Sequence, residues 1–319
     1  MAAEPTTLQE AIVYFNDPDN CIAYLVARRW RNGVVCPTCG STTVSYLARV
    51  RRWQCSARHP QRQFTLKTGT VMEDSPLGLD KWLAAIWLLL NCKNGISSYE
   101  IGRGLGISQK SAWHMMHRVR YAFHGGPLEK LSGEVEADET FIGGKARNMH
   151  ASKRAAKITG TGPKDKTAVM GILERGGKVR AMVVPNRKKK ALQSEVRKHV
   201  EAGAALYTDA LQSYDGLDEF EHGVVDHAVQ YVDGKIHTNG LENFWSLLKR
   251  GLNGTYVSVE PFHLFRYLDE QSFRYNRKDV DDHGRFMLAL SQITGKRLTY
   301  EHLTGKDRAD AQEPAPTVN

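Results

Sequence analysis

The chain has 319 residues, which is long enough for two or three domains of about 100 to 200 residues each. Its 44 Lys and Arg outnumber its 35 Asp and Glu, and the formal net charge of +9 favours a polyanionic partner. The five cysteines are too few and too scattered for a disulfide scaffold, so we expect a reducing, cytoplasmic compartment. No apolar stretch approaches the roughly 20 residues of a membrane span, and the N-terminus lacks the pattern of a signal peptide. These features exclude secreted disulfide-rich proteins and predict neither a membrane span nor an export signal.

The character of the sequence changes several times along the chain. Apolar residues recur at helical spacing over 7–31, and Asp17-Pro18 in the middle predicts two short helices. Residues 34–66 contain paired cysteines and short β-like runs without a helical period. A helical block extends from Leu79 to about Phe123, and strands alternating with helices begin near residue 130.

The second of these segments carries a candidate zinc site. A Cys-x2-Cys pair and a Cys-x3-His pair supply three thiolates and one imidazole, from Cys36, Cys39, Cys55 and His59. Gly40 provides the positive φ that the turn after the first pair needs. Four such ligands complete a closed tetrahedral Zn²⁺ site, which would stabilise a module too small to support its own core. Cys21 and Cys92 lie in helical apolar patterns and are expected in the core.

A helix-turn-helix is predicted within 96–113. A short helix ends at Leu105-Gly106, and Ser108 caps a second helix. The exposed start of the second helix would place several side chains in a DNA major groove: Gln109, Lys110, Ser111 and His114, with the basic Arg118 one turn later. An ordinary helical hairpin would have the same turn, but the basic residues that follow favour contact with DNA.

The last part of the chain predicts an α/β domain. Strands are expected at 134–142, 167–174, 178–184, 204–209 and about 224–231, and helices at about 188–202, 239–252 and 261–276. The segment 143–165 is rich in Lys and Arg and has little apolar periodicity, so we expect a basic loop that is solvated or folds on DNA. From Thr304 the sequence is polar and rich in Pro and Ala, which predicts disorder.

Three acidic residues lie where strands and a helix could bring them together. Asp138 is in the first strand of this domain, Asp209 ends the strand 204–209, and Glu242 opens the helix 239–252. Buried carboxylates repel one another unless a cation neutralises them. Two Mg²⁺ or Mn²⁺ ions about 4 Å apart would do so and would promote phosphodiester chemistry. A simpler interpretation is that strand-end aspartates cap turns and that Glu242 stabilises the dipole of its helix.

The spacing leaves two choices open. Glu136 and Glu139 compete with Asp138 for the first position. Asn239, nearly one turn before Glu242, could contribute an amide oxygen to a metal or simply begin the helix.

The helix 239–252 has two faces. Glu242 and Lys249 are two turns apart and share one face, where Lys249 could bind a DNA phosphate. An apolar face suited to the sheet is formed by Leu241, Phe244 and Leu248. Trp245 lies between the faces and is expected at the edge of the core, with stacking on a base as the alternative.

Five blocks, taken together, resemble the DDE-type bacterial insertion-sequence transposases that begin with a zinc ribbon. The blocks are CPTCGS, RRWQCSARHPQRQFTLKTGTVMEDS, NGISSYEIGRGLGISQKSAWHMMHRVR, EADETFIGGK and HTNGLENFWSLLKRGLNGTY with FRYLDEQSFRYNR. They occur in the family's order over roughly residues 10–280. The group with the greatest similarity is the insertion-sequence family numbered fifteen-ninety-five, whose catalytic region is the ISXO-type transposase domain.

The resemblance implies an RNase H-like catalytic domain of the retroviral-integrase type. It implies that Asp138 and Asp209 are the first two metal ligands, that Asn239 or Glu242 is the third, and that Lys249 is the basic residue that follows. We rank Glu242 first because its charge and its spacing from Lys249 suit the chemistry. The cysteine that is often the fourth zinc ligand in the family is absent, so His59 would replace it.

The expected organisation has five parts. They are a helical segment at 1–33, a zinc ribbon at 34–70, a helix-turn-helix region at 71–125, the catalytic domain at 130–280 and a C-terminal extension with a disordered tail at 281–319. The expected function is that of a transposase that binds the terminal inverted repeats of its element in duplex DNA, cleaves the ends and joins them to target DNA. We expect it to act as a homo-oligomer assembled on DNA. The alternatives are a transcription regulator with a scaffold domain and an RNase H-like nuclease or resolvase without strand transfer.

Overall fold

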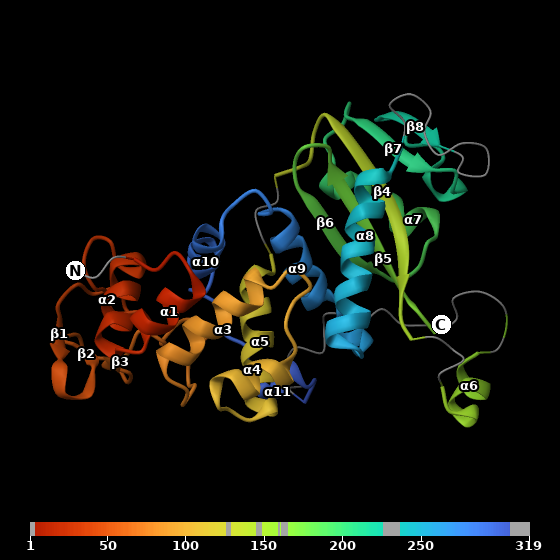
Figure 1. The fold of residues 1–319 in the computed structure, drawn as a ribbon. Coiled ribbons are helices and arrows are strands. Elements are labelled where there is room, and N and C mark those ends of the chain that lie inside the picture. The colour runs from red at the N-terminus through yellow and green to blue at the C-terminus, as the bar shows by residue number, and fades with distance from the viewer. Residues whose placement is uncertain are drawn as a thin grey trace. The chain divides into compact units, whose positions relative to one another are not determined.

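The computed structural model describes residues 4–125, 129–144, 149–158, 160, 165–225 and 237–306 (Figure 1). They form two compact units. The first comprises the described residues up to 124 together with 279–306, and the second comprises those between 125 and 278. The segment that follows the predicted catalytic domain therefore packs with the N-terminal unit. The predicted disordered tail lies, from residue 307 onward, outside the described residues.

Two capped helices begin the first unit. In α1 (Leu8–Phe15), Thr7 accepts the backbone N–H of Glu10 and the Glu10 side chain accepts that of Thr7, which is a capping box. In α2 (Pro18–Arg29), Asp17 caps the helix and Pro18 fits its first turn. The predicted break between two short helices is confirmed.

A small antiparallel sheet follows, made of β1 (Val44–Leu47), β2 (Arg52–Cys55) and β3 (Gln63–Phe64) in that order, with a 3-10 turn at Ala48–Val50. Its buried side is aromatic. The ring of Trp53 stacks on that of Phe64 with centroids 6.0 Å apart, and Trp30 meets Trp53 edge-on at 5.5 Å.

The rest of the first unit is helical. It contains α3 (Leu79–Asn91), α4 (Ser98–Leu105), α5 (Gln109–Phe123), α10 (Asp282–Leu290) and α11 (Tyr300–Leu303). The apolar α3 lies at the centre and contacts α1, α2, α4, α5 and α10. Phe286 of α10 packs against the rings of Phe15, Tyr24 and Trp87, so residues near the C-terminus complete the core of this unit.

A five-stranded mixed sheet forms the centre of the second unit. The strands are β4 (Glu134–Ile142), β5 (Thr167–Glu174), β6 (Val179–Val184), β7 (Ala205–Asp209) and β8 (Glu221–Val225), in the order β6-β5-β4-β7-β8. Neighbours among β4, β5 and β6 are antiparallel, whereas β7 is parallel to both β4 and β8. The first four match their predicted positions closely. The fifth begins three residues earlier than predicted, and 226–231 lie outside the described residues.

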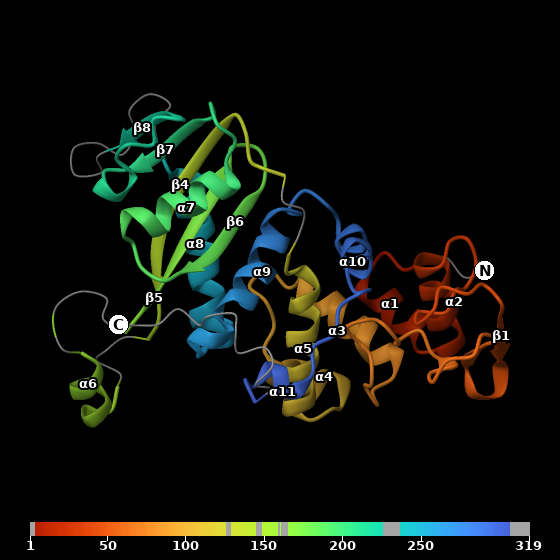
Figure 2. The same ribbon diagram turned by 180° about the vertical axis from the view of Figure 1, so that it is seen from behind.

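Helices cover both faces of this sheet. One face is covered by α7 (Lys189–His199) and by the 3-10 turn Gln212–Tyr214, and the other by α8 (Asn239–Gly251) and α9 (Leu264–Tyr275). Figure 1 shows α8 in front of the sheet, and in Figure 2 α7 lies over the opposite face. Between α8 and α9 the chain forms a π-helical turn at Leu252–Tyr256 and a 3-10 turn at Pro261–His263. In the segment expected to be a basic loop, Ala151–Lys157 forms a short helix, α6.

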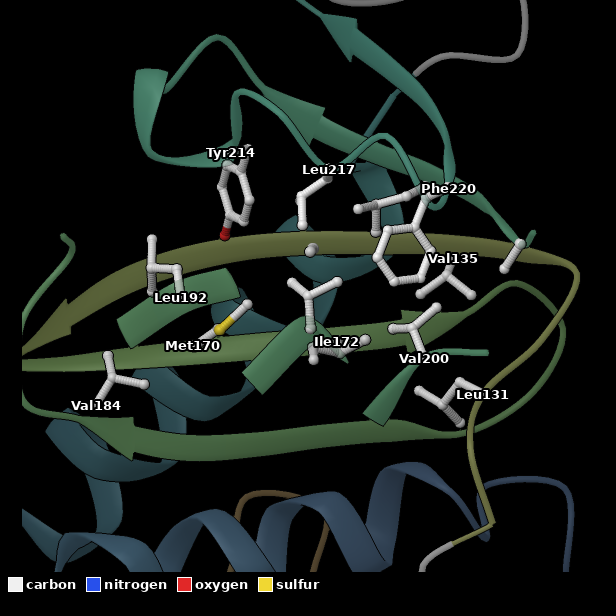
Figure 3. Packing of buried hydrophobic residues seen from close by; sticks show 14 of the residues in the cluster. Leu131, Val135, Met170, Ile172, Val184, Leu192, Val200, Tyr214, Leu217 and Phe220 are labelled. Atoms are coloured by element: carbon white, nitrogen blue, oxygen red, sulfur yellow. The ribbon is translucent and has the colours of Figure 1, made fainter. Parts of the chain in front are cut away.

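Alternate residues of each strand enter the two cores. Val135 and Ala137 of β4 face α7, together with Met170 and Ile172 of β5. Figure 3 shows this core, with Tyr214, Leu217 and Phe220 packing over the sheet. Residues of opposite parity in β4 therefore face α8, which places Glu136 and Asp138 on the α8 side.

Candidate functional site

The four predicted zinc ligands lie together in the first unit. The ligand atoms of Cys36, Cys39, Cys55 and His59 are all within 4.8 Å of one another. The Cys39 and Cys55 sulfurs are 3.7 Å apart, and the Cys36 sulfur is 3.5 Å from Nε2 of His59. A tetrahedron with Zn–S bonds of about 2.3 Å has S–S edges of roughly 3.8 Å, so this spacing suits a zinc ion and is far too long for a disulfide.

The strand and turn around these residues fix that geometry. The backbone N–H of Cys36 donates to the Ser41 carbonyl at 2.9 Å, and that of Gly40 donates to the Cys36 carbonyl at 2.8 Å. Gly40 has the expected positive φ, +73°. Cys36 and Cys55 are buried and His59 is half-buried, whereas Cys39 is exposed. The donor set and its closure fit a structural zinc ion.

The acidic residues of the second unit come from three elements. Asp138 is on β4, Asp209 ends β7 and Glu242 is in the first turn of α8. The parallel register pairs Glu136 with Tyr207, and continuing it by two residues brings Asp209 alongside Asp138. Among the described residues, these carboxylates do not form a cluster as tight as the four zinc ligands.

Asp138 is buried, and both Asp209 and Glu242 act on its charge. Burial, with smaller contributions from the negative charges of Asp209 and Glu242, raises the pKa of Asp138 to about 6. A hydrogen bond from the Trp245 indole opposes this shift. The ionised form of Asp138 is therefore disfavoured in the metal-free protein, which is the condition that a bound cation relieves.

The faces of α8 agree with the predicted pattern. Glu242 and Lys249 are exposed, while Leu241, Phe244 and Leu248 are buried against the sheet. Asn239 is the first residue of the helix and is exposed. Trp245 is only 4% exposed, and its indole N–H donates to Oδ2 of Asp138 at 2.8 Å. Trp245 thus lies in the core beside Asp138, close to its expected position at the core edge, and its buried ring is not available to stack on a base in this conformation.

Glu136, one of the two competitors of Asp138, has a different role. It is 1% exposed and accepts hydrogen bonds from the Arg175 guanidinium at 3.0 Å and from the backbone N–H of Leu241 at 3.0 Å. Arg175 also donates to the His237 carbonyl at 2.8 Å. Glu136 thus satisfies a free N–H at the start of α8, where Thr238 makes no side-chain cap.

Glu139, the other competitor, faces the opposite core. Its carboxylate accepts a hydrogen bond from the Tyr214 hydroxyl, and burial raises its pKa to about 7. Because successive residues of a strand point to opposite faces, Glu139 lies across the sheet from α8, whereas Asp138 faces it. Of the three, only Asp138 accepts a hydrogen bond from α8 and also lies near the charges of both Asp209 and Glu242.

The predicted helix-turn-helix corresponds to α4 and α5. Gly106 ends α4 in a left-handed conformation with φ of +61°, and Ser108 caps α5 by accepting the Ser111 N–H at 3.1 Å. Ile101, Ala112 and Met116 are buried between the helices and their neighbours. The turn and its caps follow the sequence pattern.

The predicted DNA-contacting residues divide into two groups. Lys110 is exposed, and Ser111 and His114 are half-buried. Gln109 is also half-buried and donates to the Ser98 hydroxyl at 2.9 Å. Arg118, by contrast, is 6% exposed, donates to the Glu73 carbonyl and lies 5.3 Å from the Trp82 ring centroid. Burial lowers the pKa of Arg118 to about 10. Arg118 is therefore buried in this structure and does not belong to the exposed surface on which its predicted DNA contact depends.

A residue from far along the chain joins the exposed part of α5. The Tyr300 ring of α11 lies 5.5 Å from the His114 ring, and the Lys110 ammonium is 4.9 Å from its centroid. The local sequence around Tyr300 does not predict its contacts with His114 and Lys110, because these contacts require residues 279–306 to pack with the first unit. The same is true of Arg175, whose partner Glu136 lies 39 positions away.

Comparison with known proteins finds matches in both units of the chain. A family model described as an ISXO2-like transposase domain matches residues 130–276, and one described as a transposase zinc-ribbon domain matches 16–59. An uncharacterized protein in the transposable element ISH50 of Halobacterium salinarum is 30% identical over 242 residues, which cover 70% of this chain and 80% of that protein. The chain belongs to the ISXO2-like transposase family.

A second relative of this transposase is shorter. An uncharacterized transposase-like protein of Haemophilus influenzae is 33% identical over 105 residues, which cover 32% of this chain and 85% of that protein. No solved structure matches the chain. Within the described residues, no helix is long and apolar enough to span a bilayer.

Proposed function

We propose that this transposase binds the terminal inverted repeats of its insertion sequence, cleaves the DNA ends and joins them to target DNA. The observation that carries the proposal is geometric: the parallel register of β4 and β7 brings Asp209 alongside Asp138, and α8, which packs against β4, carries Glu242 in its first turn. The central strand β4 pairs antiparallel with β5, which pairs antiparallel with β6, and on its other side β7 and β8 run parallel to it. This mixed sheet supports an RNase H-like fold for the second unit.

Asp138, Asp209 and Glu242 are the proposed ligands of two divalent cations, Mg²⁺ or Mn²⁺. The cations, when bound, would activate a water or a 3′-hydroxyl and stabilise the leaving oxygen of the phosphodiester. The carboxylates position that pair, and Lys249, exposed on the same face of α8 as Glu242, would bind a neighbouring phosphate. Asn239 is the alternative third ligand, because it lies on the first turn of the same helix.

End recognition is assigned to the first unit. The exposed start of α5 offers Lys110 and Ser111 to a major groove, with Gln109 and His114 beside them. The zinc ribbon, with Zn²⁺ held by Cys36, Cys39, Cys55 and His59, would support this surface as a rigid module.

Lys110→Ala should weaken binding to terminal-repeat DNA, and loss of a base contact would cost about 1 to 3 kcal/mol. The protein would act as an oligomer that holds both element ends.

The test is a joining assay. The full-length protein is incubated with Mg²⁺, a labelled terminal-repeat duplex and a supercoiled plasmid. The proposal predicts labelled plasmid in which the 3′ end of the repeat is covalently joined to target DNA. Cleavage without joined product would instead indicate a nuclease or resolvase, and binding without cleavage would indicate a regulator.

A further inference from the structure

Trp245 is in direct contact with a proposed metal ligand. Its indole N–H donates to Oδ2 of Asp138 at 2.8 Å, and it follows Glu242 by three residues on α8. One side chain therefore connects the helix that carries Glu242 to the strand that carries Asp138. The transposase needs these two carboxylates at a fixed separation.

The indole ring has little freedom to move. Gly171 of β5 lies opposite Asp138 in the sheet, and a Cβ atom at Gly171 would come within 2.6 Å of the Trp245 ring. The ring thus occupies the space that the missing side chain leaves. Phe244 packs beside it with ring centroids 5.2 Å apart. Because the ring is 4% exposed and closely packed, the direction of its N–H is set by the fold.

The chemistry of the contact suits a supporting role. An indole N–H only donates, and a buried one needs an acceptor. A carboxylate offers two oxygens and about four lone-pair directions, so accepting one bond at Oδ2 leaves capacity for a cation. Hydrogen bonds of this kind to metal ligands typically contribute 10- to 100-fold to metal affinity.

We propose that Trp245 is a positioning residue that uses its indole N–H to hold the Asp138 carboxylate in the orientation that binds the catalytic cation. The inference rests on the proposed function, in which Asp138 is a metal ligand. Its distinctive claim is that the hydrogen bond, rather than the burial of the ring, supports the metal site.

The test compares Trp245→Phe with Phe244→Leu in the full-length, zinc-loaded protein. Trp245→Phe keeps an aromatic ring and removes the N–H, whereas Phe244→Leu disturbs packing next to it without touching Asp138. Mn²⁺ binding is measured directly by calorimetry or electron paramagnetic resonance, alongside the melting temperature. We expect roughly 10-fold or greater loss of Mn²⁺ affinity for Trp245→Phe. For Phe244→Leu we expect a lower melting temperature and Mn²⁺ affinity within about twofold of the parent.

Equal affinity of Trp245→Phe and the parent would overturn the inference, as would an equal loss in Phe244→Leu. Asp138→Asn separates this failure from failure of the proposed function. If Asp138→Asn abolishes Mn²⁺ binding while Trp245→Phe does not weaken it, only the role of Trp245 is wrong. If Asp138→Asn leaves Mn²⁺ binding intact, both the proposed metal site and the inference fail.

A second measurement does not depend on the folding of Trp245→Phe. The protein has six tryptophans, so ¹⁵N-indole labelling gives six N–H resonances. We expect Mg²⁺ to shift one of them and Asp138→Asn to shift the same one. If no indole resonance responds to both changes, the proposed contact does not serve the metal site.

Discussion

Within four residues, β4 carries three acidic side chains that differ in environment. Glu136 accepts hydrogen bonds from Arg175 and from the start of α8. Glu139 accepts a hydrogen bond from Tyr214 in the opposite core. Asp138 lies near the negative charges of Asp209 and Glu242. The Arg175 guanidinium balances the negative charge of Glu136. Burial raises the pKa of Glu139 to about 7, and the Tyr214 hydroxyl donates a hydrogen bond to its carboxylate. Glu139 also has Asp209 and Asp138 as charged neighbours, but its side chain lies in the opposite core. Asp138 is the one of these three that faces α8 and has both Asp209 and Glu242 as charged neighbours, which is why we propose it as the metal ligand.

Asp138→Asn should stabilise the metal-free protein at neutral and alkaline pH. The pKa of Asp138 in the folded chain is about 6, against about 3.9 for an ordinary aspartate. Proton binding therefore favours the folded state below about pH 4, and this contribution disappears as the pH rises through about 6. Asparagine stays neutral and can still accept the Trp245 hydrogen bond.

Melting temperatures measured without added divalent cations, with zinc left in place, check this expectation. The variant should exceed the parent increasingly as the pH rises from 4 to 8. A variant that melts below the parent at pH 8 would show that the Asp138 charge is not unfavourable in the folded protein.

At the scale of elements, the close approach of α8 to the sheet depends on two glycines. A Cβ atom at Gly171 would lie 2.6 Å from the Trp245 ring, and one at Gly240 would lie 2.8 Å from the Glu136 carboxylate. Helix and sheet are in contact at these positions because neither residue has a side chain. Glu242 reaches the neighbourhood of Asp138 only with α8 in this position.

Gly171→Ala should push α8 away from β5 and destabilise the second unit by about 1 to 3 kcal/mol, the usual effect of overpacking. Chemical unfolding and Mn²⁺ affinity should both report the change. Gly254→Ala is the matched control, because a Cβ atom there meets nothing within 4 Å. Equal stability of Gly171→Ala and Gly254→Ala would contradict the tight contact.

The zinc ribbon gives a second prediction for an element. The purified protein should contain about one zinc per chain by elemental analysis, and Cys36→Ser should lose it, because the remaining three ligands cannot close the tetrahedron. Cys92→Ser should keep its zinc, since Cys92 is remote from the cluster in the sequence and belongs to no ligand set among the described residues. A metal-free parent protein with an ordered ribbon would contradict a structural role for zinc.

Local patterns were sufficient to predict most elements, and long-range contacts were not. The capping residues and Pro18 mark the break between α1 and α2, and alternation marks the strands of the second unit. The same alternation could not separate Asp138 from Glu136 and Glu139, because their partners Trp245, Arg175 and Tyr214 lie 39 to 107 positions away. The burial of Arg118 was also not predictable from the local sequence, because the position of a basic residue on a helix does not show how that helix packs.

At the scale of the whole molecule, the first unit combines residues 4–124 with residues 279–306. Residues 279–306 supply α10, whose Phe286 packs on Phe15 and Trp87, and α11, whose Tyr300 contacts His114 beside the proposed DNA surface. A fragment that ends near residue 125 lacks all of these contacts. The first unit, to which we assign end recognition as a proposal, is therefore discontinuous in sequence.

Two truncations test this arrangement. A chain that ends after residue 278 lacks Phe286, so the rings of Phe15, Tyr24 and Trp87 lose a packing partner. We expect this chain to lose binding to terminal-repeat DNA. A chain that ends after residue 306 is the control and should bind as the full-length protein does. Full binding by the shorter chain would mean that 279–306 are dispensable for recognition.

The most direct test of the central claim is strand transfer by single variants of the proposed site: Asp138→Asn, Asp209→Asn, Glu242→Gln and Asn239→Ala. Each is assayed with labelled terminal-repeat DNA, and binding of the same DNA is measured in parallel. The account predicts that the three carboxylate variants lose cleavage and joining, that Asn239→Ala retains them, and that all four bind DNA normally, because the carboxylates hold metal and do not read bases. If Asn239→Ala is inactive while Glu242→Gln is active, the third ligand is the asparagine. Strand transfer by all four variants would contradict the assignment of the catalytic site.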